Sequence, residues 1–358
     1  MPSELFVEIS PDKKYPIFIN SDPLENLEKQ IHNYTKANKS LVVISEKVNK
    51  LYGKFFNPPH SVKFVLKDGE DQKNFKNYQK ILNIALKNKL ERKDAIVAIG
   101  GGVVGDIAGF VASTYLRGID FIQIPTTLLS CVDSSVGGKT AINTDFGKNL
   151  VGTFYQPKAV FCNPNFLTTL DERQFKTGLA EVVKYAFIQS SCQSNIQDNF
   201  FDFLTENSGK ILARDKETLA EIIKICLELK ASVVVKDEKE QDLRKILNFG
   251  HTYAHAVEKI TNYKKHTHGE AVAIGMVFAI NLAFEKELIT QSYKNEALAL
   301  IEKYCLIKKT KKINQKKMIE LMKSDKKVKD GEITFILPTQ KSSAECFNIT
   351  TDEIIKIV

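Results

Sequence analysis

The chain has 358 residues, of which 43% are hydrophobic and 26% are charged. These proportions are ordinary for a globular protein and exclude collagen, coiled coil and disorder as its main character, and the length suggests about two domains. The net charge of +8 comes from lysine far more than from arginine, so we expect anionic small-molecule ligands rather than nucleic acid. The chain shows no apolar run long enough for a membrane span, no signal-peptide pattern and no CxxC motif among its six cysteines, which predicts a cytoplasmic protein.

Short apolar runs alternate with helical patterns in the first part of the chain. Strands are predicted at residues 40–45, 62–66, 95–100 and 121–125, with a helix over 74–90. Strands of this kind, separated by helices, indicate a parallel α/β sheet. Two further runs, LFVEI and YPIFIN, are consistent with a hairpin on that sheet. We therefore predict an α/β domain over residues 1–164.

After Pro164 the pattern becomes helical. Helices are predicted over residues 179–188, 217–234, 244–260, 270–284 and 293–304, and one strand over 332–338. This composition predicts a mostly α-helical domain over residues 165–358.

A glycine-rich segment follows the predicted strand at 95–100. Gly100, Gly102 and Gly105 match the pattern GxGxxG and open a helical pattern. Glycine lets the backbone approach a pyrophosphate, whose charge a helix N-terminus stabilises. We therefore favour phosphate or dinucleotide binding by the α/β domain over a purely structural turn. Asp120 has the spacing of a ribose-binding acid but precedes the next strand, so an ordinary Rossmann domain is not predicted.

The block from Pro125 to Pro157 is rich in Ser, Thr, Gly, Asn and Lys, yet it is too apolar for a linker. Lys139 follows two glycines, and Lys148 follows another. Lysine beside glycine suits anion binding at close backbone approach. An anion site is favoured, and an ordered structural loop is the alternative.

Four of the six histidines lie between residues 251 and 268. His251 and His255 are four residues apart and would share a helical face, and His268 precedes another helical pattern. With Glu181 on a further amphipathic helix, these groups suit a divalent metal, most simply zinc. Spacing alone nominates His251 and His255 as ligands, without separating ligand from base.

Charged and polar residues also recur on the helical patterns. Glu181 and Lys184 are three residues apart and share a face. One face of the predicted helix 244–260 carries Arg244, Asn248, His251 and His255. Such polar residues are poorly suited to a hydrophobic core, so this face is expected to line a solvated, anion-binding metal pocket.

Together these segments resemble the 3-dehydroquinate synthase family. The resemblance rests on the block from GGGVVGD to GTFYQP, on GLAEVVKYAFI, LNFGHTYAHAVE and HGEAVAIGM, and on DKK at 325–327. It implies a dehydroquinate synthase-like fold, a homodimer, NAD+ and a divalent metal, zinc or cobalt. It also implies a lyase of the shikimate pathway. In that reaction, 3-deoxy-D-arabino-heptulosonate 7-phosphate is oxidised at C5, loses phosphate, is reduced again and closes to 3-dehydroquinate.

The resemblance also implies roles for individual residues. The metal ligands are Glu181, His251 and His268, and His255 becomes a catalytic acid/base instead of a ligand. The NAD+-binding positions are Asp68, Glu70, Lys73, Gly102, Val103, Val104, Gly105, Asp106, Thr126, Thr127, Lys139, Lys148, Phe166, Leu167, Thr168 and Thr169. The substrate-pocket positions are Asp133, Lys139, Asn149, Lys184, Lys230, Glu240, Arg244, Asn248 and Lys326, with Lys327 as the alternative to the last. Arg117 resembles an arginine that reaches the neighbouring subunit's site.

The chain departs from the family pattern at a few positions, none of which removes a catalytic group. Asp242 stands where glycine is usual, Ser45 and Glu46 where an Asp or Asn is expected, and His266 is an additional histidine. The alternatives are a sibling sugar-phosphate cyclase such as 2-deoxy-scyllo-inosose synthase, a metal-dependent dehydrogenase of the glycerol dehydrogenase type, and a basic binding protein without enzymatic activity. The sibling cyclases are disfavoured because three residues together favour a substrate with a carboxylate: Lys230, Arg244 and Asn248.

Overall fold

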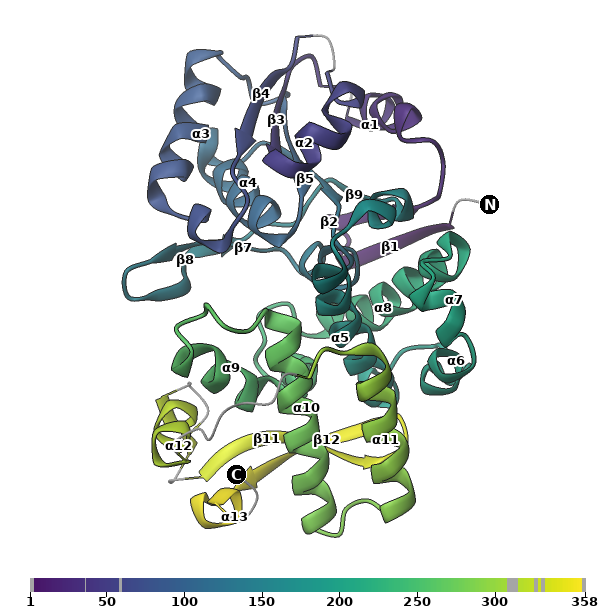
Figure 1. Ribbon diagram of the computed structural model, residues 1–358. Coiled ribbons are helices and arrows are strands. Elements are labelled where there is room, and N and C mark those ends of the chain that lie inside the picture. Colours follow the sequence, from purple (N-terminus) through teal and green to yellow (C-terminus); the bar gives the residue numbers. More distant parts are fainter. Residues whose placement is uncertain are drawn as a thin grey trace. The chain divides into compact units, whose positions relative to one another are not determined.

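The computed structural model describes residues 3–35, 37–57, 60–307, 315–324, 328–329 and 332–355 (Figure 1). It contains two compact units. The first comprises Met1–Leu170 and Lys216–Leu227, and the second comprises Asp171–Asp215 and Glu228–Val358. The functional division predicted between residues 164 and 165 remains a prediction.

The first unit is built on a seven-stranded sheet with the order β1-β2-β9-β6-β5-β3-β4. The predicted hairpin is antiparallel and consists of β1 (Ser3–Ser10) and β2 (Lys13–Ile19). The remaining pairs are parallel and involve β3 (Ser40–Ser45), β4 (Val62–Leu66), β5 (Ala95–Gly100), β6 (Asp120–Pro125) and β9 (Ala159–Cys162). All four predicted strands of the parallel sheet are thus present.

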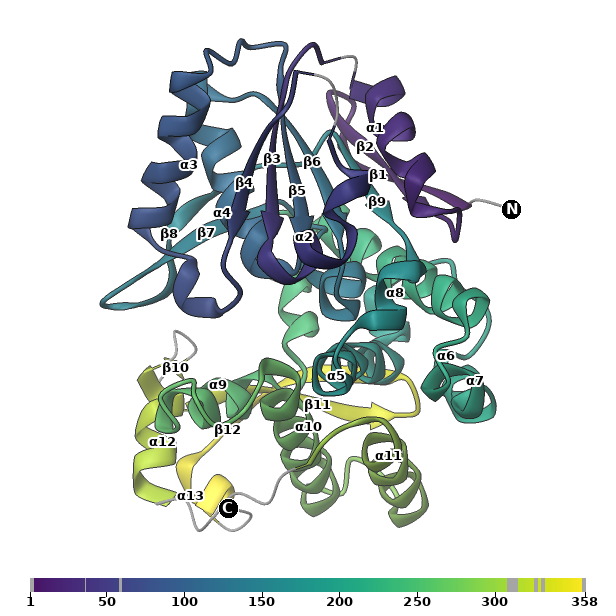
Figure 2. The ribbon, with the colours of Figure 1, turned by 45° about the horizontal axis from the view of Figure 1, so that its top comes forward.

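Helices cover both faces of this sheet (Figure 2). Leu41 and Val43 of β3 pack into one hydrophobic cluster, whereas Val42 and Ile44 pack into another on the opposite face. Side chains alternate between the faces of a strand, so a strand covered on both sides reads as a continuous apolar run. The helices of this unit are α1 (Leu27–Thr35), α2 (Glu46–Tyr52), α3 (Phe75–Lys87) and α4 (Gly102–Thr114).

The block between Pro125 and Pro157 is largely regular structure. A π-helical turn over Ser130–Ser134 is followed by a hairpin of β7 (Lys139–Thr144) and β8 (Gly147–Phe154). This hairpin forms its own two-stranded sheet.

The second unit is mostly helical and contains a three-stranded antiparallel sheet. Its helices are α5 (Glu172–Ile188), α6 (Phe200–Glu206), α7 (Ser208–Leu212), α9 (His251–Ile260), α10 (His268–Glu285), α11 (Gln291–Tyr304), α12 (Gln315–Ser324) and α13 (Thr351–Ile355). Its strands are β10 (Val328–Lys329), β11 (Glu332–Gln340) and β12 (Ser343–Ile349). Helix α8 (Lys216–Lys236) begins in the first unit and ends in the second. The predicted fold class is confirmed.

The prediction of one continuous helix over 244–260 is wrong, although its second part is α9. Its first part is a short 3-10 helix, Leu243–Asn248, and a turn separates this from α9. Gly250 in that turn has φ 78°, a left-handed conformation that glycine adopts without steric cost and that commonly ends a helix. Arg244 and Asn248 therefore do not share one helical stripe with the histidines of α9.

Two other sequence features can be compared with the structure. Within the described ranges, no helix has the length and apolar character needed to cross a membrane. All six cysteines are free thiols, and five of them are buried.

Candidate metal centre and surrounding residues

Glu181 lies on a stretch of α5 in which every residue from Thr177 to Ile188 is buried. Its carboxylate is only 1% exposed. Lys184, one turn further along, places its Nζ 2.5 Å from Glu181 Oε2. Burial alone would raise the pKa of Glu181, but the neighbouring charges, Lys184 foremost, hold it well below its usual range. The carboxylate is therefore ionised.

Two histidines from neighbouring helices face this carboxylate. His251 is the first residue of α9, and His268 is the first residue of α10. Their Nε2 atoms lie 3.6 Å and 3.4 Å from Glu181 Oε1, respectively. One potential ligand atom from each of the three residues lies within 4.8 Å of the other two. Two imidazoles and one carboxylate form a donor set that zinc enzymes use, with a position left for substrate or water.

The surroundings of the carboxylate fit a cation. Both Glu181 oxygens are buried, and neither makes a hydrogen bond of regular geometry within the described part of the chain. Burying an ionised carboxylate is costly unless its charge is compensated. Lys184 compensates the charge at Oε2. A divalent cation between Oε1 and the two imidazoles would compensate it at the other oxygen.

The second nitrogen of each imidazole also has a partner. His251 Nδ1 lies 3.0 Å from the carbonyl oxygen of Phe249, and His268 Nδ1 lies 3.3 Å from Glu258 Oε1. Both partners are acceptors, so the hydrogen of the neutral ring is placed on Nδ1 and Nε2 is left to bind a metal.

The electrostatic environment of the two rings differs. Burial lowers the pKa of His251 to about 3. Burial acts in the same direction on His268, but the close contacts of its ring nitrogens with the carboxylates of Glu181 and Glu258 outweigh that effect and raise its pKa to about 10. The two carboxylates thus stabilise positive charge at the site of His268, as a cation-binding pocket requires.

His255 lies outside this cluster. It follows His251 by one turn of α9, and the two ring centroids are 5.6 Å apart at an interplanar angle of 90°. Among the described residues, the cluster consists of the three residues that the family resemblance implied as ligands. Of the pair that spacing nominated, it includes His251 but not His255.

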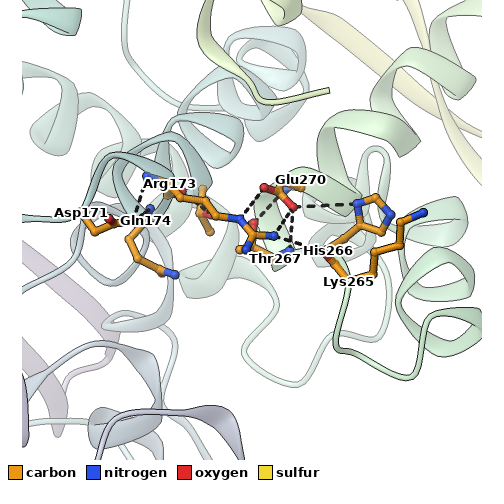
Figure 3. A network of polar contacts seen from close by, with 8 residues as sticks. Asp171, Arg173, Gln174, Lys265, His266, Thr267 and Glu270 are labelled. Atoms are coloured by element: carbon orange, nitrogen blue, oxygen red, sulfur yellow. Dashed lines mark hydrogen bonds and ion pairs between the residues drawn. The ribbon is translucent and has the colours of Figure 1, made fainter. Parts of the chain in front are cut away.

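A network of polar contacts fixes the start of α10, and with it His268 (Figure 3). The Thr267 hydroxyl accepts a hydrogen bond from the Glu270 backbone N–H, and the Glu270 carboxylate accepts one from the Thr267 backbone N–H. Arg173 of α5 donates from Nε and Nη2 to the same carboxylate, at 2.7 Å and 2.8 Å. The capping box fixes the first turn of α10, and the bidentate ion pair joins that turn to α5.

Two predicted substrate residues of the second unit are buried cations. Lys230 on α8 is 5% exposed, and Arg244 in the 3-10 helix is 3% exposed. Nearby in sequence, Asn248 donates a hydrogen bond to Glu240 Oε1 at 3.0 Å. Buried cations of this kind favour an anionic ligand.

Asp237 organises the loop that leads to Arg244. Its carboxylate accepts hydrogen bonds from the backbone N–H groups of Gln241, Asp242 and Arg244 at 2.8 Å, 2.8 Å and 3.0 Å. Burial would raise the pKa of Asp237, but these three hydrogen bonds lower it. The loop is therefore held by one ionised side chain.

In the first unit, predicted NAD+ positions follow the carboxyl ends of three parallel strands. Asp68 comes after β4, Gly102 after β5, and Thr126 after β6. Ligands of open α/β sheets bind at this edge. Helix α4 begins at Gly102, so its N-terminal N–H groups lie at the same edge.

An ion-pair cluster joins three of these positions. Lys73 is 4% exposed, and its Nζ lies 2.8 Å from Asp106 Oδ2 and 3.2 Å from Glu70 Oε1. Burial opposes the charge on Lys73, but the two carboxylates prevail and raise its pKa. The lysine is therefore held as a cation within the first unit.

The other predicted positions of the first unit are placed as follows. Val103, Val104 and Gly105 lie in the first turn of α4, and Thr127 exchanges hydrogen bonds with Ser130. Phe166, Leu167, Thr168 and Thr169 belong to a 3-10 helix, Pro164–Thr169. Asp133 lies in the π-helical turn, Lys139 begins β7, and Lys148 and Asn149 lie on β8. Arg117 has φ 67°. Lys326 and Lys327 lie outside the described residues.

Comparisons with known proteins cover both units. The family model described as the 3-dehydroquinate synthase N-terminal domain matches residues 63–177, and the one for the C-terminal domain matches residues 178–328. The chain belongs to the 3-dehydroquinate synthase family. A relative named 3-dehydroquinate synthase from Caldanaerobacter subterraneus subsp. tengcongensis is 41% identical over 99% of both chains.

Two solved structures share the fold of this chain. A 2-deoxy-scyllo-inosose synthase complexed with carbaglucose-6-phosphate, NAD+ and Co2+ has a TM-score of 0.87 at 24% identity, over 99% of both chains. ValA, a 2-epi-5-epi-valiolone synthase from Streptomyces hygroscopicus subsp. jinggangensis 5008 with NAD+ and Zn2+ bound, has a TM-score of 0.83 at 25% identity. That match covers 96% of this chain and 95% of the other.

The departures from the 3-dehydroquinate synthase pattern have local explanations. Asp242 has a negative φ of −145°, so this position does not have the left-handed backbone that favours glycine. The Ser45 hydroxyl accepts a hydrogen bond from the Val48 backbone N–H and thereby caps α2. His266 is buried, with its Nδ1 3.8 Å from the Glu270 carboxylate (Figure 3).

Two residues that contact the candidate site residues were not predicted from the motifs. Glu258 contacts His268, and Asp237 accepts a hydrogen bond from the backbone of Arg244. Glu258 is seven residues after His251, so the two share a face of α9, and that spacing was the available signal. Asp237 directly follows α8, and an acidic residue at the end of a helix predicts a turn. It does not predict which backbone N–H groups donate hydrogen bonds to that carboxylate.

Proposed function

We propose that this chain is a 3-dehydroquinate synthase that converts 3-deoxy-D-arabino-heptulosonate 7-phosphate to 3-dehydroquinate and phosphate, with NAD+ and one divalent metal. The observation that carries the proposal is the buried cluster of Glu181, His251 and His268 with Lys184 beside it, in a chain 41% identical to a protein of that name. The reaction is a carbon–oxygen lyase step of the shikimate pathway, which leads to chorismate and the aromatic amino acids. The free cysteines support a cytoplasmic location.

Glu181, His251 and His268 are the proposed ligands of the metal. Zinc suits this donor set, and cobalt is the alternative. The metal supplies Lewis acidity at the C5 oxygen of the substrate, and NAD+ supplies a hydride acceptor that is regenerated in the same turnover.

His255 is the proposed proton carrier. It lies one turn from the ligand His251 on the same helix, and its side chain is partly exposed. Histidine is the side chain that most often serves as a general acid or base in enzymes. We assign to His255 the removal of the proton from the C5 hydroxyl and its return when that position is reduced again.

Buried cations of the second unit are proposed to bind the negative charges of the substrate. Lys184, Lys230 and Arg244 are 2%, 5% and 3% exposed, and charge-assisted hydrogen bonds to carboxylate or phosphate oxygens would stabilise them. Glu240 and Asn248, joined by their hydrogen bond, complete this set. The residues that family resemblance adds are Asp133, Lys139 and Asn149 of the first unit, and Lys326.

The same resemblance supports three coarser assignments. Residues 1–164 bind NAD+ through the strand ends and the start of α4, and residues 165–358 bind the metal and substrate. The working form is a homodimer in which Arg117 reaches the neighbouring subunit's site. The chain has no nucleic-acid or membrane partner in this proposal.

The experiment that tests the function uses purified protein with Zn2+, catalytic NAD+ and one of three sugar phosphates. Released phosphate and net NADH are followed together, and the product is identified by NMR. Phosphate release and 3-dehydroquinate from 3-deoxy-D-arabino-heptulosonate 7-phosphate alone is the expected result. Phosphate from glucose 6-phosphate or sedoheptulose 7-phosphate instead would reassign the chain to a sibling cyclase. Net NADH without phosphate would make it a dehydrogenase.

A further inference from the structure

We propose that Glu258 is a positioning residue for the metal ligand His268, whose ring it orients through Nδ1 and whose affinity for the metal it increases. This inference rests on the proposed function, because it concerns the metal that the function requires. It adds a residue that neither the motifs nor the spacing of ligands assigned.

The His268 ring is held between two carboxylates. Its Nδ1 lies 3.3 Å from Glu258 Oε1, and its Nε2 lies 3.4 Å from Glu181 Oε1. Glu258 is 8% exposed, so water competes little for its oxygens. An ionised carboxylate only accepts hydrogen bonds, so Glu258 selects the ring form with hydrogen on Nδ1. That form leaves the Nε2 lone pair directed at the proposed metal position.

The two histidine ligands differ in the partner that orients them. His251 Nδ1 faces the neutral carbonyl of Phe249 at 3.0 Å, two residues earlier in the chain. His268 Nδ1 faces a charged side chain from another helix. A carboxylate behind an imidazole increases its basicity as a ligand, and losing such a partner typically reduces metal affinity about 10- to 100-fold. We therefore expect the orientation and metal affinity of His268 to depend on the Glu258 side chain. The orientation of His251 depends on a backbone carbonyl instead.

A purely structural role for Glu258 is separable from this one. The start of α10 is already held by the Thr267 capping box and by the two hydrogen bonds from Arg173 to Glu270 (Figure 3). These contacts do not involve Glu258. Removing its carboxylate should thus free the ring of His268 while the helix that carries it remains in place.

The test compares Glu258→Gln and Glu258→Ala with the control Glu285→Gln, which removes an exposed carboxylate at the far end of α10. Zn2+ affinity is measured by competition with a chromophoric chelator, the Co2+-loaded proteins are compared by visible absorption, and thermal unfolding is measured without metal. We expect Glu258→Ala to lose about 10- to 100-fold in Zn2+ affinity with a changed Co2+ spectrum. Glu258→Gln should lose less, because its amide oxygen still accepts from Nδ1. The metal-free unfolding temperature should match that of the control.

Two results would overturn the proposal. The first is that the Glu258 variants have the same Zn2+ affinity and Co2+ spectrum as the control, whether or not their unfolding temperature is lower. Glu258 would then be a structural contact only. Failure of the unmutated protein to bind one Zn2+ would remove the metal site itself. That second failure is seen before any variant is made, so it is distinguished from a failure confined to Glu258.

Discussion

Replacing Gly269 by alanine should separate the proposed metal ligands without changing any of them. Gly269 is buried and follows His268 directly at the start of α10. A Cβ at this position would meet backbone atoms of Thr177 on α5, with the carbonyl oxygen at 2.2 Å and Cα at 2.6 Å. Backbone atoms inside a packed helix cannot rotate aside as a flexible side chain can. The two helices must therefore move apart.

The size of the effect follows from these distances. Ordinary contact begins at 3.4 Å, so the approach at 2.2 Å requires a displacement of about 3.4 − 2.2 = 1.2 Å. Overpacking of this kind costs about 1–3 kcal/mol, and the better helix propensity of alanine offsets at most about 1 kcal/mol. Metal sites tolerate deviations of only about 0.2 Å in ligand distance. We expect a lower unfolding temperature and a Zn2+ affinity reduced more than about tenfold.

Thermal unfolding without metal and Zn2+ titration of the same samples measure the two consequences. Gly209→Ala is the matched control, because a Cβ added at Gly209 has no neighbour within 4 Å. This control should bind Zn2+ as the unmutated protein does and unfold at the same or a slightly higher temperature. If Gly269→Ala behaved like the control in both measurements, the close approach of α5 and α10 would not be what sets the ligand geometry.

Three further predictions concern other parts of the second unit. His255→Ala should reduce kcat about 10²- to 10⁴-fold while leaving the bound Zn2+ unchanged, as measured by initial rates and metal analysis; an equal loss of metal would make it a ligand. Asp237→Ala should raise the KM for the sugar phosphate with unchanged Zn2+ affinity, because three backbone N–H groups around Arg244 lose their acceptor; an unaltered KM would contradict this. The hydrogen bond from Lys286, at 2.6 Å, is the largest of the contacts that lower the pKa of Glu353 to about 2. This lowered pKa stabilises the fold above the ordinary value of 4.5, and the stabilisation is lost as the pH falls toward 2. Unfolding temperatures of the unmutated protein and Glu353→Gln should accordingly differ at neutral pH and converge below pH 4.5, whereas a constant difference would argue against the ion pair.

The parallel sheet was predictable because both of its faces are buried. Val42 and Val43 pack into opposite clusters, so neither face needed a polar residue and the strand stood out as one apolar run. The helix over 244–260 was mispredicted because its periodicity continues across Gly250 by coincidence, whereas the backbone turns there. The spacing of apolar residues does not reveal a left-handed backbone conformation at a single residue.

The metal cluster shows a different limit. Spacing within one helix pairs His251 with His255, but His268 reaches Glu181 only because α9 and α10 bring their first residues to the same part of α5. That proximity depends on packing between helices, such as the close approach at Gly269, and no local pattern encodes it. Family resemblance supplied it instead. Glu258 escaped notice because its role becomes visible only once the ring of His268 is placed.

In the proposed reaction, oxidation and reduction occur within one turnover, so the cofactor is not consumed. The decisive measurement supplies 3-deoxy-D-arabino-heptulosonate 7-phosphate in large excess over NAD+ and follows phosphate and NADH to completion. We expect all of the substrate to release phosphate and no NADH to accumulate. Phosphate release that stops when it equals the NAD+ supplied, with an equal amount of NADH formed, would contradict it.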